Sequence, residues 1–297
     1  MNIKNVTVFG AGVLGTQIAF QTAFHKFNVT LYDIKDEFLD KAKARFKNLG
    51  EIYKTDLGAT QQEIEETLAR FSYTTNLTES VKDADLTIEA IPENVQIKKD
   101  FYIQLGKVAP EKTIFCTNSS TLLPSQFAQE TGRPGKFLAL HFANEIWKNN
   151  TAEIMGHSGT DPENFNTVVA FAKAIGMVTL PIYKEQPGYI LNSLLVPLLD
   201  ASLTLYANGV ADPETIDKTW MIGTGAPVGP FGIYDVVGLT TAYNITKMHA
   251  DAGDKQAAKG AKILKENFID KGKLGVVNGE GFYTYPEPKF KEPDFLE

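Results

Sequence analysis

The sequence is poor in cysteine and histidine, and these absences limit its chemistry. It holds one cysteine, Cys116, within an apolar segment, and four histidines. A single cysteine cannot form a disulfide within the chain, which indicates a reducing compartment such as the cytoplasm. Cys116 is predicted to be a small buried hydrophobe rather than a nucleophile. The histidines lack the spacing of metal ligands with a second soft ligand, so we expect no metal site.

Strong runs of one charge and long apolar runs are also lacking. The chain has 29 Lys and Arg against 36 Asp and Glu, a net charge of −7 and a pI of about 5.3. This balance argues against nucleic acid or an anionic membrane as a partner. No apolar run is expected to reach membrane-spanning length, and the first residues lead directly into a strand, so we expect no secretory signal.

What the sequence does contain is a glycine-rich motif near its start. Val6 to Phe9 form a short apolar strand, and a helical pattern of apolar residues follows the motif. A second β-branched run, Val29 to Tyr32, ends at Asp33. The motif between strand and helix has the G-x-G-x-x-G pattern, Gly10-Ala11-Gly12-Val13-Leu14-Gly15.

Each part of this segment has a physical role in holding a dinucleotide. Gly10 makes the tight turn, Gly12 lets a pyrophosphate approach the backbone, and Gly15 lets the helix pack closely. The helix N-terminus offers free N–H groups and a positive dipole end to the phosphates. Asp33 would accept hydrogen bonds from the adenine-ribose hydroxyls and repel a 2′-phosphate, which favours NAD over NADP. The alternative is a glycine turn that only packs a helix on a sheet.

The first part of the chain alternates between strands and helices. Two helical stretches, about 37–53 and 61–71, follow Asp33; most of their basic residues are predicted to lie on a solvated face, with one or two meeting a phosphorylated ligand. The alternation favours an α/β fold, with an N-terminal Rossmann-type, doubly wound, mostly parallel sheet covered on both faces. The further strands are predicted at 71–74, 85–91, 113–117, 136–142, 152–155 and 177–183.

The pattern changes near Lys184, after which we find only helices and loops. We therefore predict an NAD-binding domain over residues 1–184 and an all-helical domain over 185–297. Tyr189 to Tyr206 is predicted to be a long helix, apolar nearly all round and kinked at Pro197. Such a helix is buried in its own domain or against another subunit. Residues 223–238 are rich in Gly and Pro and are predicted to be irregular.

His141 is the histidine best placed for catalysis. It stands at the carboxyl end of a predicted strand, where ligands bind in such sheets. Oxidising an alcohol with NAD removes a proton from oxygen, and a base with a pKa near neutrality suits that task. Glu153 follows in a short strand that can return beside the first, and a carboxylate would orient the imidazole. Taken separately, His141 could be a core histidine and Glu153 a surface charge.

Short runs spread over the whole chain match the motifs of one known family. His141-Phe142-Ala143-Asn144-Glu145, followed by Glu153, resembles a His-Phe-Phe-Asn-Pro run with a later Glu. Together the runs resemble the L-3-hydroxyacyl-CoA dehydrogenase family, which includes 3-hydroxybutyryl-CoA dehydrogenases. The other runs are Asn118-Ser119-Ser120, Glu89 to Asn94 with Lys98, Pro187-Gly188-Tyr189-Ile190-Leu191-Asn192 (Phe in the family where Tyr189 stands), Pro227 to Phe231, Asp235 to Leu239 and Gly279 to Tyr283.

The resemblance implies a role for each of these residues. His141 would be the general acid/base paired to Glu153, and Ser120 and Asn192 would hydrogen-bond near the reacting oxygen and the thioester. NAD would be the cofactor, and Asn144 would position it or His141. The helical domain, residues 185–297, would cover the substrate and form a homodimer. The implied cofactor-binding residues are Gly10, Gly12, Val13, Leu14, Gly15, Asp33, Ala90, Glu93, Lys98, Asn118 and Asn144.

The sequence leaves three functions to compare. The first is an NAD-dependent dehydrogenase that converts an (S)-3-hydroxyacyl-CoA to the 3-oxoacyl-CoA, or the reverse. The second is a dehydrogenase of the same fold that acts on a free hydroxy acid or sugar acid. It is motivated by Ala143 and Glu145, which replace the Phe and Pro of the family run. The third is a non-enzymatic NAD-binding protein, which would have no need of His141, Ser120 or Glu153.

Overall fold

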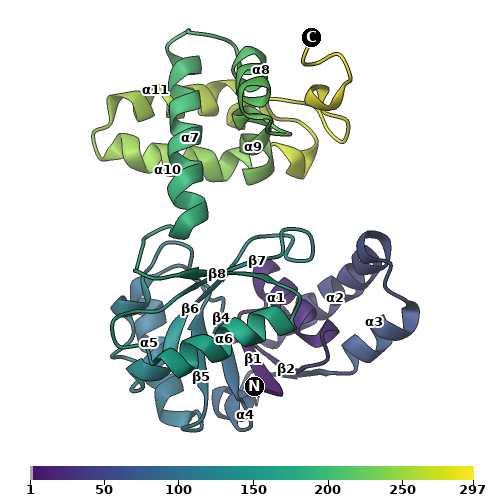
Figure 1. The fold of residues 1–297 in the computed structure, drawn as a ribbon, viewed down its shortest axis with the longest axis vertical. Helices are drawn as coiled ribbons and strands as arrows, with labels where there is room; N and C mark the ends of the chain where they lie inside the picture. The colour runs from purple at the N-terminus through teal and green to yellow at the C-terminus, as the bar shows by residue number, and fades with distance from the viewer. Residues whose placement is uncertain (1–2) are drawn as a thin grey trace. The chain divides into compact units, whose positions relative to one another are not determined.

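The computed structural model describes residues 3–297, and the chain divides into two compact units (Figure 1). The sheet unit ends at Ile190, and the helical unit runs from Leu191 to Glu297. The division thus falls after the boundary at residue 184 that the sequence suggests. Tyr189 and Ile190 belong to the sheet unit because their polar groups bond to Ser119 and Glu153 there.

One eight-stranded sheet forms the centre of the sheet unit, in the order β3-β2-β1-β4-β5-β6-β7-β8. Neighbouring strands are parallel except β6 and β7, which are antiparallel, so the predicted mostly parallel sheet is confirmed. The strand order reverses beside β1, the point where ligands bind in doubly wound sheets. The strands are β1 Asn5–Phe9, β2 Asn28–Tyr32, β3 Phe71–Thr74, β4 Leu86–Glu89, β5 Ile114–Thr117, β6 Phe137–Phe142, β7 Thr151–Met155 and β8 Val178–Ile182.

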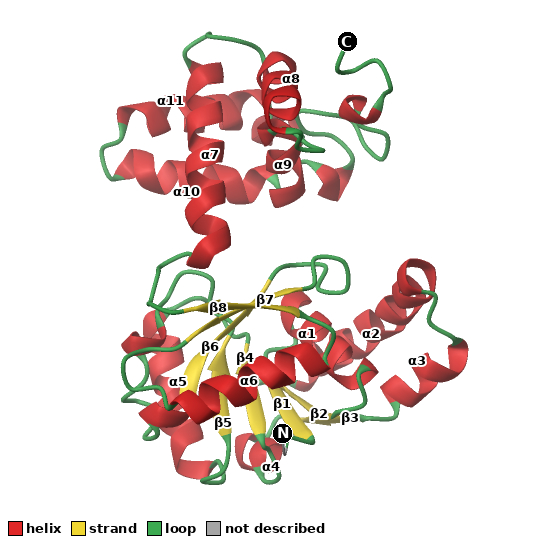
Figure 2. Cartoon of the chain, viewed as in Figure 1, coloured by secondary structure: helices red, strands yellow, loops and turns green. Residues whose placement is uncertain are grey.

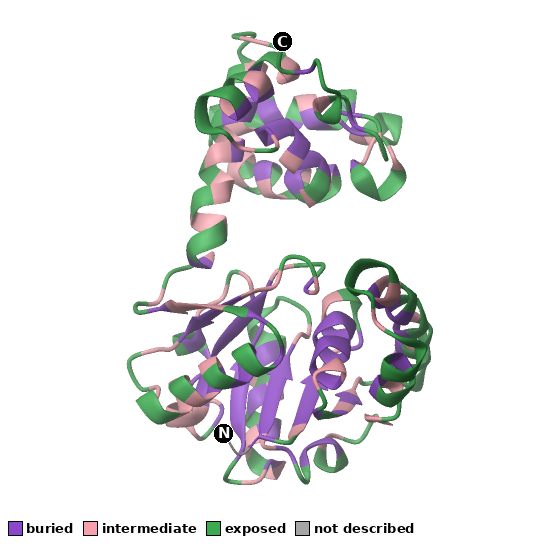
Figure 3. Ribbon diagram, turned by 45° about the vertical axis from the view of Figure 1, so that its right-hand side comes forward, coloured by how far each residue is buried: buried purple, intermediate pink, exposed green. Residues whose placement is uncertain are grey.

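Side chains alternate between the two faces of the sheet, and each face packs into its own core. Val8 and Leu140 belong to one core, together with residues of α1 and α6. Phe9 and Phe115 belong to the other, together with residues of α4 and α5. Figure 2 shows these helices packed around the strands, and Figure 3 shows that the central strands are buried. The helices are α1 Val13–Phe24, α2 Asp36–Leu57, α3 Gln61–Leu68, α4 Leu77–Val81, α5 Val95–Val108 and α6 Pro162–Ala174.

The insert after β2 is built from α2 and α3, and both helices have clear local stop and start signals. Gly58 ends α2 with φ +70°, a conformation that glycine adopts without strain. Thr60 begins α3 with a capping box, in which Thr60 and Glu63 each accept a bond from the other's backbone N–H. These caps explain why the insert is helical although it lies outside a minimal strand–helix–strand unit.

The described residues of the helical unit form helices, short 3-10 turns and isolated bridges. Leu203, Phe231 and Leu264 lie in its core. The helices are α7 Tyr189–Ala207, whose first two residues belong to the sheet unit, α8 Pro213–Thr224, α9 Pro230–Val237, α10 Leu239–Asp251 and α11 Lys255–Asn267. The 3-10 turns in the two units are Pro124–Gln126, Pro134–Lys136, Ile269–Lys271, Val276–Asn278 and Lys289–Lys291.

The prediction that residues 223–238 are irregular is wrong, because α9 lies within them. Pro230 occupies the first turn of α9, where a missing N–H costs nothing. The carboxylate of Asp217 accepts the next two backbone N–H groups, from Phe231 at 2.9 Å and Gly232 at 3.1 Å. A cap supplied by another helix cannot be seen in the local sequence.

The prediction that no apolar run reaches membrane-spanning length is also wrong. By length and composition alone, α7 is long and apolar enough to cross a membrane, with 19 residues and a mean hydropathy of 1.5. Polar residues such as Asn192 and Asp200 interrupt the apolar run in the sequence, but they do not lower the helix average enough. The test is weak evidence for a membrane span, since core helices pass it too, and Leu199 and Leu203 of α7 are buried in the helical unit.

Candidate active site

His141 and Glu153 face each other across β6 and β7. The two strands are antiparallel, and their register sets His141 directly opposite Glu153. Residues in such a pair have neighbouring side chains on the same face of the sheet. His141 Nδ1 lies 3.0 Å from Glu153 Oε2, and the two residues are 6% and 4% exposed. The structure therefore brings the two predicted residues together as a buried pair.

Ser120 approaches the opposite nitrogen of the same imidazole. It follows β5, the neighbour of β6, and its Oγ lies 3.1 Å from His141 Nε2. The turn is held beside β6 because the Phe142 N–H donates to Asn118 Oδ1 at 3.0 Å. Since Nδ1 faces a carboxylate, we assign the proton of the neutral ring to Nδ1, which leaves Nε2 to accept. With this tautomer, Nε2 accepts a hydrogen bond from the Ser120 hydroxyl.

Glu93 ties this turn to the start of α5. Its Oε1 accepts bonds from Ser119 Oγ at 2.5 Å and from the Thr121 N–H at 3.0 Å. Burial by itself raises the pKa of Glu93, but the hydrogen bonds to the carboxylate and the charge of Lys98 together lower the pKa by more than burial raises it. The net pKa is below the usual value, so Glu93 is an anion at neutral pH.

Lys98 is buried, and its ammonium is held by two carboxylates. Its Nζ lies 2.5 Å from Glu89 Oε1 and 3.3 Å from Glu93 Oε2. Glu89, the last residue of β4, also accepts from Tyr102 Oη and Thr117 Oγ1, each at 2.9 Å. Glu89 lies in a run that resembles the family motif, but no role was predicted for it, although its place at the carboxyl end of a buried strand was a usable signal. Lys98 holds Glu93 here, and its contact with the cofactor stays a prediction.

The glycine-rich turn has the shape that a dinucleotide requires. A Cβ at Gly10, where φ is +100°, would lie 2.4 Å from the Ala90 carbonyl oxygen, and one at Gly15 would lie 2.0 Å from that of Gly10. Close packing therefore demands glycine at both positions. A Cβ at Gly12 would meet nothing within 4 Å, and Val13 is 61% exposed. The backbone at the start of α1 is thus open to a phosphate group, which fits a bound NAD.

Asp33 lies beside the same turn. Its Oδ2 accepts the Ala11 N–H and its Oδ1 the Ile34 N–H, each at 2.7 Å. A carboxylate has about four acceptor positions, so ribose hydroxyls can still bind. Arg45 of α2 donates from Nη1 to the Ala11 carbonyl at 2.7 Å. The sequence did not single out Arg45 among the basic residues of its helix, because only the fold shows that α2 passes the turn. Leu14 packs partly buried against the core.

The segment after β6, residues 143–150, departs from the family motif in conformation as well as in sequence. Glu145 has φ +57°, and its N–H donates to Gln17 Oε1 at 2.8 Å. Proline has φ near −65° and no N–H, so the family's proline would not fit this conformation. Asp56 at the end of α2 accepts from Trp147 Nε1 at 2.8 Å and pairs with Lys148 at 3.1 Å. The segment is therefore fastened to α1 and α2.

Two predicted site residues are not brought to the imidazole by any described contact. Asn144 is exposed, and its carbonyl accepts from Asn149 Nδ2 at 2.8 Å. Asn192 lies in the helical unit, one turn into α7. Their roles stay predictions.

The other histidines have local partners. His25 Nδ1 lies 3.0 Å from the Gln21 carbonyl, and His157 Nε2 lies 3.0 Å from that of Pro134. His249 lies 3.9 Å from Asp200. Within residues 3–297 no group of three or more His, Cys, Asp and Glu is arranged to hold a metal ion.

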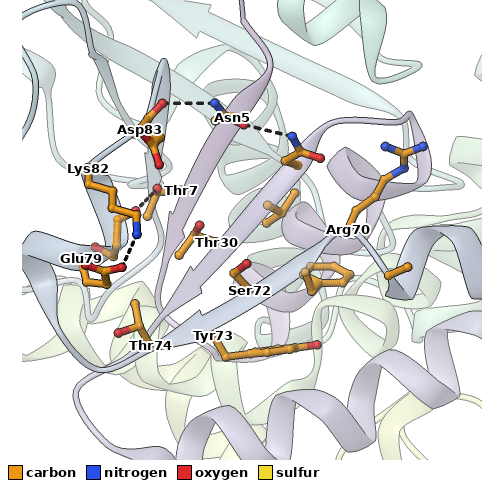
Figure 4. A pocket seen from close by; sticks show the side chains of 16 residues that line it. Asn5, Thr7, Thr30, Arg70, Ser72, Tyr73, Thr74, Glu79, Lys82 and Asp83 are labelled. Carbon is orange, nitrogen blue, oxygen red and sulfur yellow. Dashed lines mark hydrogen bonds and ion pairs between the residues drawn. The ribbon is translucent and has the colours of Figure 1, made fainter.

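A hydroxyl-lined groove lies away from this site, on the part of the sheet formed by β1, β2 and β3 (Figure 4). Thr30, Ser72 and Thr74 contribute side chains to it, and Arg70 and Lys82 stand at its sides. Glu79 and Ser80 of the short helix α4 also line it. The groove contains none of the predicted site residues.

Comparisons with known proteins agree with the geometry. A family model described as 3-hydroxyacyl-CoA dehydrogenase, NAD binding domain, matches residues 5–186, and one described as its C-terminal domain matches residues 188–285. A probable 3-hydroxyacyl-CoA dehydrogenase of Caenorhabditis elegans is 36% identical over 289 residues, 95% of this chain and 93% of that protein. A probable 3-hydroxybutyryl-CoA dehydrogenase of Deinococcus radiodurans is 34% identical over 280 residues, 94% of this chain and 99% of that protein.

A solved structure adds a different substrate to the comparison. It is a diketoreductase, described as a dual catalyst of dicarbonyl compounds. It is 58% identical, covers 96% of this chain and 100% of its own, and has a TM-score of 0.92. The similar proteins are thus named for different substrates.

Proposed function

This chain belongs to the 3-hydroxyacyl-CoA dehydrogenase family, and from that premise we propose that it interconverts the 3-hydroxy and 3-oxo groups of its substrate with NAD. The observation that carries the proposal is the chain of contacts from Ser120 through the buried His141 to the buried Glu153. A histidine with one nitrogen held by a carboxylate and the other beside a hydroxyl has the arrangement of a general acid/base.

The protein's residues move and hold one proton in this proposal. His141 Nε2 takes the proton from the C3 hydroxyl during oxidation and returns it during reduction. Glu153 stabilises the imidazolium that forms, and Ser120 donates a hydrogen bond to the substrate oxygen. NAD, when bound, supplies the redox chemistry by accepting the hydride from C3. Gly12, Val13 and the other glycine-turn residues would hold its pyrophosphate, Asp33 its ribose, and Glu93 and Asn118 its nicotinamide side.

A 3-hydroxyacyl-CoA is the first candidate substrate, because both family models and the relatives bear that name. Purified protein would be mixed with NADH and acetoacetyl-CoA and followed by absorbance at the NADH band. NADPH is the control, since Asp33 is expected to reject the 2′-phosphate. Turnover with NADH alone supports this candidate, and its absence while NADH still binds moves the assignment to the second.

The second candidate is a substrate of the same 3-oxo chemistry without CoA. It is favoured by the 58% identity to a diketoreductase and by the altered segment 143–150, which leaves no place for the family's proline. A 3-oxoacyl thioester is itself a dicarbonyl compound, so the same acid/base pair serves either substrate. Acetoacetyl-CoA, ethyl acetoacetate and acetoacetate share the 3-oxo group and differ only in the group on the second carbonyl, which is a thioester, an ester or a free carboxylate. A kcat/KM that favours the ester or the free acid would overturn the first candidate.

A protein that only binds NAD is the remaining alternative, and His141→Gln separates it from an enzyme. We expect the variant to bind NADH as the wild type does, measured by NADH fluorescence, and to lose about 10²–10⁴-fold in turnover. His249→Gln, the same change at a histidine of the helical unit, is the control. Unchanged turnover in the His141 variant would reject the assignment of His141.

A homodimer through the helical unit and a cytoplasmic location complete the proposal. Leu194 and Leu205 of α7 are 70% and 42% exposed, which leaves apolar surface for a second copy to cover. Light scattering of the purified protein should give twice the mass of one chain, and Leu194→Lys should shift it toward the monomer. A wild-type protein that is monomeric at all concentrations would reject the dimer.

A further inference from the structure

Tyr189, the first residue of α7, stacks on the imidazole of His141. The ring centroids are 4.4 Å apart, the planes differ by 16°, and Tyr189 is 1% exposed. Gly188 and Tyr189 both have positive φ, +79° and +57°. For a residue with a bulky side chain this conformation is uncommon, and such backbone strain concentrates at functional sites. The turn at Gly188 thus places the phenol ring of Tyr189 against the face of the imidazole.

The hydroxyl of Tyr189 holds the backbone that leads to Ser120. It donates to the Ser119 carbonyl oxygen at 2.7 Å. Burial raises the pKa of Tyr189, so the hydroxyl keeps the proton it donates. The Ser119 carbonyl belongs to the peptide that continues into Ser120, whose Oγ lies 3.1 Å from His141 Nε2. The contacts therefore form a closed loop. Tyr189 stacks on His141, His141 contacts Ser120, and the Ser119 carbonyl next to Ser120 bonds back to Tyr189.

Ile190, the next residue, contacts the other hydrogen-bond partner of the imidazole, Glu153. The Ile190 N–H donates to Glu153 Oε1 at 2.9 Å, while Glu153 Oε2 contacts His141 Nδ1 at 3.0 Å. Two consecutive residues, Tyr189 and Ile190, thus hold both hydrogen-bond partners of His141. Neither touches a reacting atom in this arrangement.

We propose that Tyr189 is a positioning residue for the acid/base step, with separate tasks for its ring and its hydroxyl. The phenol ring of Tyr189 stacks on the imidazole and fixes the orientation of the imidazole plane. The negative face of the phenol ring favours the protonated imidazole over the neutral one. The hydroxyl keeps Ser120 within reach of Nε2. The proposal rests on the acid/base role of His141, and the hydroxyl task is particular to chains with Tyr where the family motif has Phe.

Two substitutions separate the tasks. Tyr189→Phe keeps the ring and removes the hydroxyl, and we expect kcat/KM to fall about 3–10-fold, as for one lost hydrogen bond. Tyr189→Leu removes both, and we expect a fall of about 10–100-fold, as for a misplaced catalytic group. The matched control is Tyr183→Leu, because Tyr183 is a surface tyrosine, 96% exposed; it should behave as the wild type.

The pH profile of the oxidation distinguishes positioning from general support of the fold. Oxidation needs the neutral imidazole, so kcat/KM falls on the acid side. Loss of the ring face destabilises the protonated imidazole, and Tyr189→Leu should therefore move the acid limb to lower pH. Tyr189→Phe should leave it in place. An unmoved limb with wild-type kcat/KM in the Leu variant would overturn the proposal. If the Leu variant does not fold, wild-type kinetics of Tyr189→Phe would overturn the hydroxyl task.

A second readout does not depend on turnover. A stacked aromatic ring displaces the His141 Hε1 proton resonance upfield, and His141→Gln identifies that resonance among the four histidines. The displacement should persist in Tyr189→Phe and vanish in Tyr189→Leu. If the wild type turns over no 3-oxo compound, the proposed function fails, and this resonance alone decides the stacking: the same position in all three proteins would overturn it.

Discussion

Buried carboxylates are handled differently in the two units. In the sheet unit, Glu89 meets the ammonium of Lys98 and Glu153 meets the imidazole of His141. In the helical unit, the described partners of Asp217 and Asp235, both 0% exposed, are backbone N–H groups and tyrosine hydroxyls. The sheet unit therefore pairs its buried anions with groups that carry or exchange a proton, and the helical unit surrounds them with neutral donors.

The difference corresponds to two uses of a buried charge. Asp235 binds the segment that returns to α9, accepting the Phe282 and Tyr283 N–H groups, each at 2.8 Å. A Cβ at Gly281 would lie 2.0 Å from Asp235 Oδ1, so this glycine admits the carboxylate. Burial raises the pKa of Asp235 to about 6. Such a carboxylate joins chain segments, whereas Glu153 lies against the imidazole of His141.

Replacing the carboxylate beside the imidazole should have the largest effect on catalysis. Glu153→Gln keeps an oxygen for the Ile190 N–H but removes the charge that supports the imidazolium. We expect kcat/KM to fall about 10²–10⁴-fold with NADH binding unchanged. Asp217→Asn, which alters a carboxylate of the helical unit, should leave kcat/KM per folded molecule near the wild-type value. Equal losses in the two variants would break the comparison between the units.

Removing one partner of the buried pair should have the largest effect on stability. Lys98→Met leaves Glu89 without its cation, and we expect the free energy of unfolding to fall by about 3–5 kcal/mol. The double variant Glu89→Gln, Lys98→Met removes the stranded charge and should recover most of that loss. Urea unfolding of the wild type, Lys98→Met, Glu89→Gln and the double variant measures the loss and its recovery. A single Lys98 variant as stable as the wild type would contradict the prediction.

A smaller loss of stability is expected in the helical unit, because the described donors to its buried carboxylates, Asp217 and Asp235, are neutral. Asp217→Asn replaces one oxygen, which accepts a bond from Phe231, Gly232 or Tyr283, by an NH₂ group. We expect unfolding to become easier by about 1–3 kcal/mol. Urea unfolding followed by tryptophan fluorescence measures it, with the exposed Asp251→Asn as the control. A loss as large as that of Lys98→Met would remove the distinction between charged and neutral partners.

The smallest expected effect is a pH dependence. The pKa of Asp235 is raised to about 6 in the folded protein from 3.8, so the folded state binds its proton more tightly than the unfolded state. The resulting stability is fully present below about pH 4 and is lost as the pH rises through about 6. We expect a decline of about 1–2 kcal/mol over that window.

The measurement is urea unfolding at several pH values between 4 and 7. Asp235→Asn should be less stable than the wild type and should lack this part of the decline. A wild-type stability that rises over the same window, with the same slope in the variant, would show that other groups dominate the titration.

Much of the fold could be predicted, because it rests on local patterns. The strands that alternate with helices predict the mostly parallel sheet, and the run from Val6 to Asp33 predicts an NAD-binding domain; both predictions are confirmed. Errors arose where a partner lies far away in the chain. Asp217 caps α9 from another helix, and Arg45 reaches the Ala11 carbonyl from α2.

The candidate site divides in the same way. His141, Glu153 and Ser120 could be named from their positions at strand ends and from a family resemblance. The network around Glu89 and the stacking of Tyr189 on His141 could not be named, since both depend on where a side chain from one element lands on another. Residues 143–150 differ from the family motif, but only the positive φ of Glu145 shows that the backbone itself takes a different course.

The sequence by itself determined the class of fold and the glycine-rich turn, and it predicted which residues form the acid/base pair. These depend on periodicity, on glycine where a Cβ would clash, and on residue types at strand ends, all of which are local. The tertiary structure decided which groups surround His141 and how each buried charge is compensated. Those outcomes depend on strand register and helix packing, which join residues such as Glu153 and Ile190, or Trp147 and Asp56, that are distant in the chain.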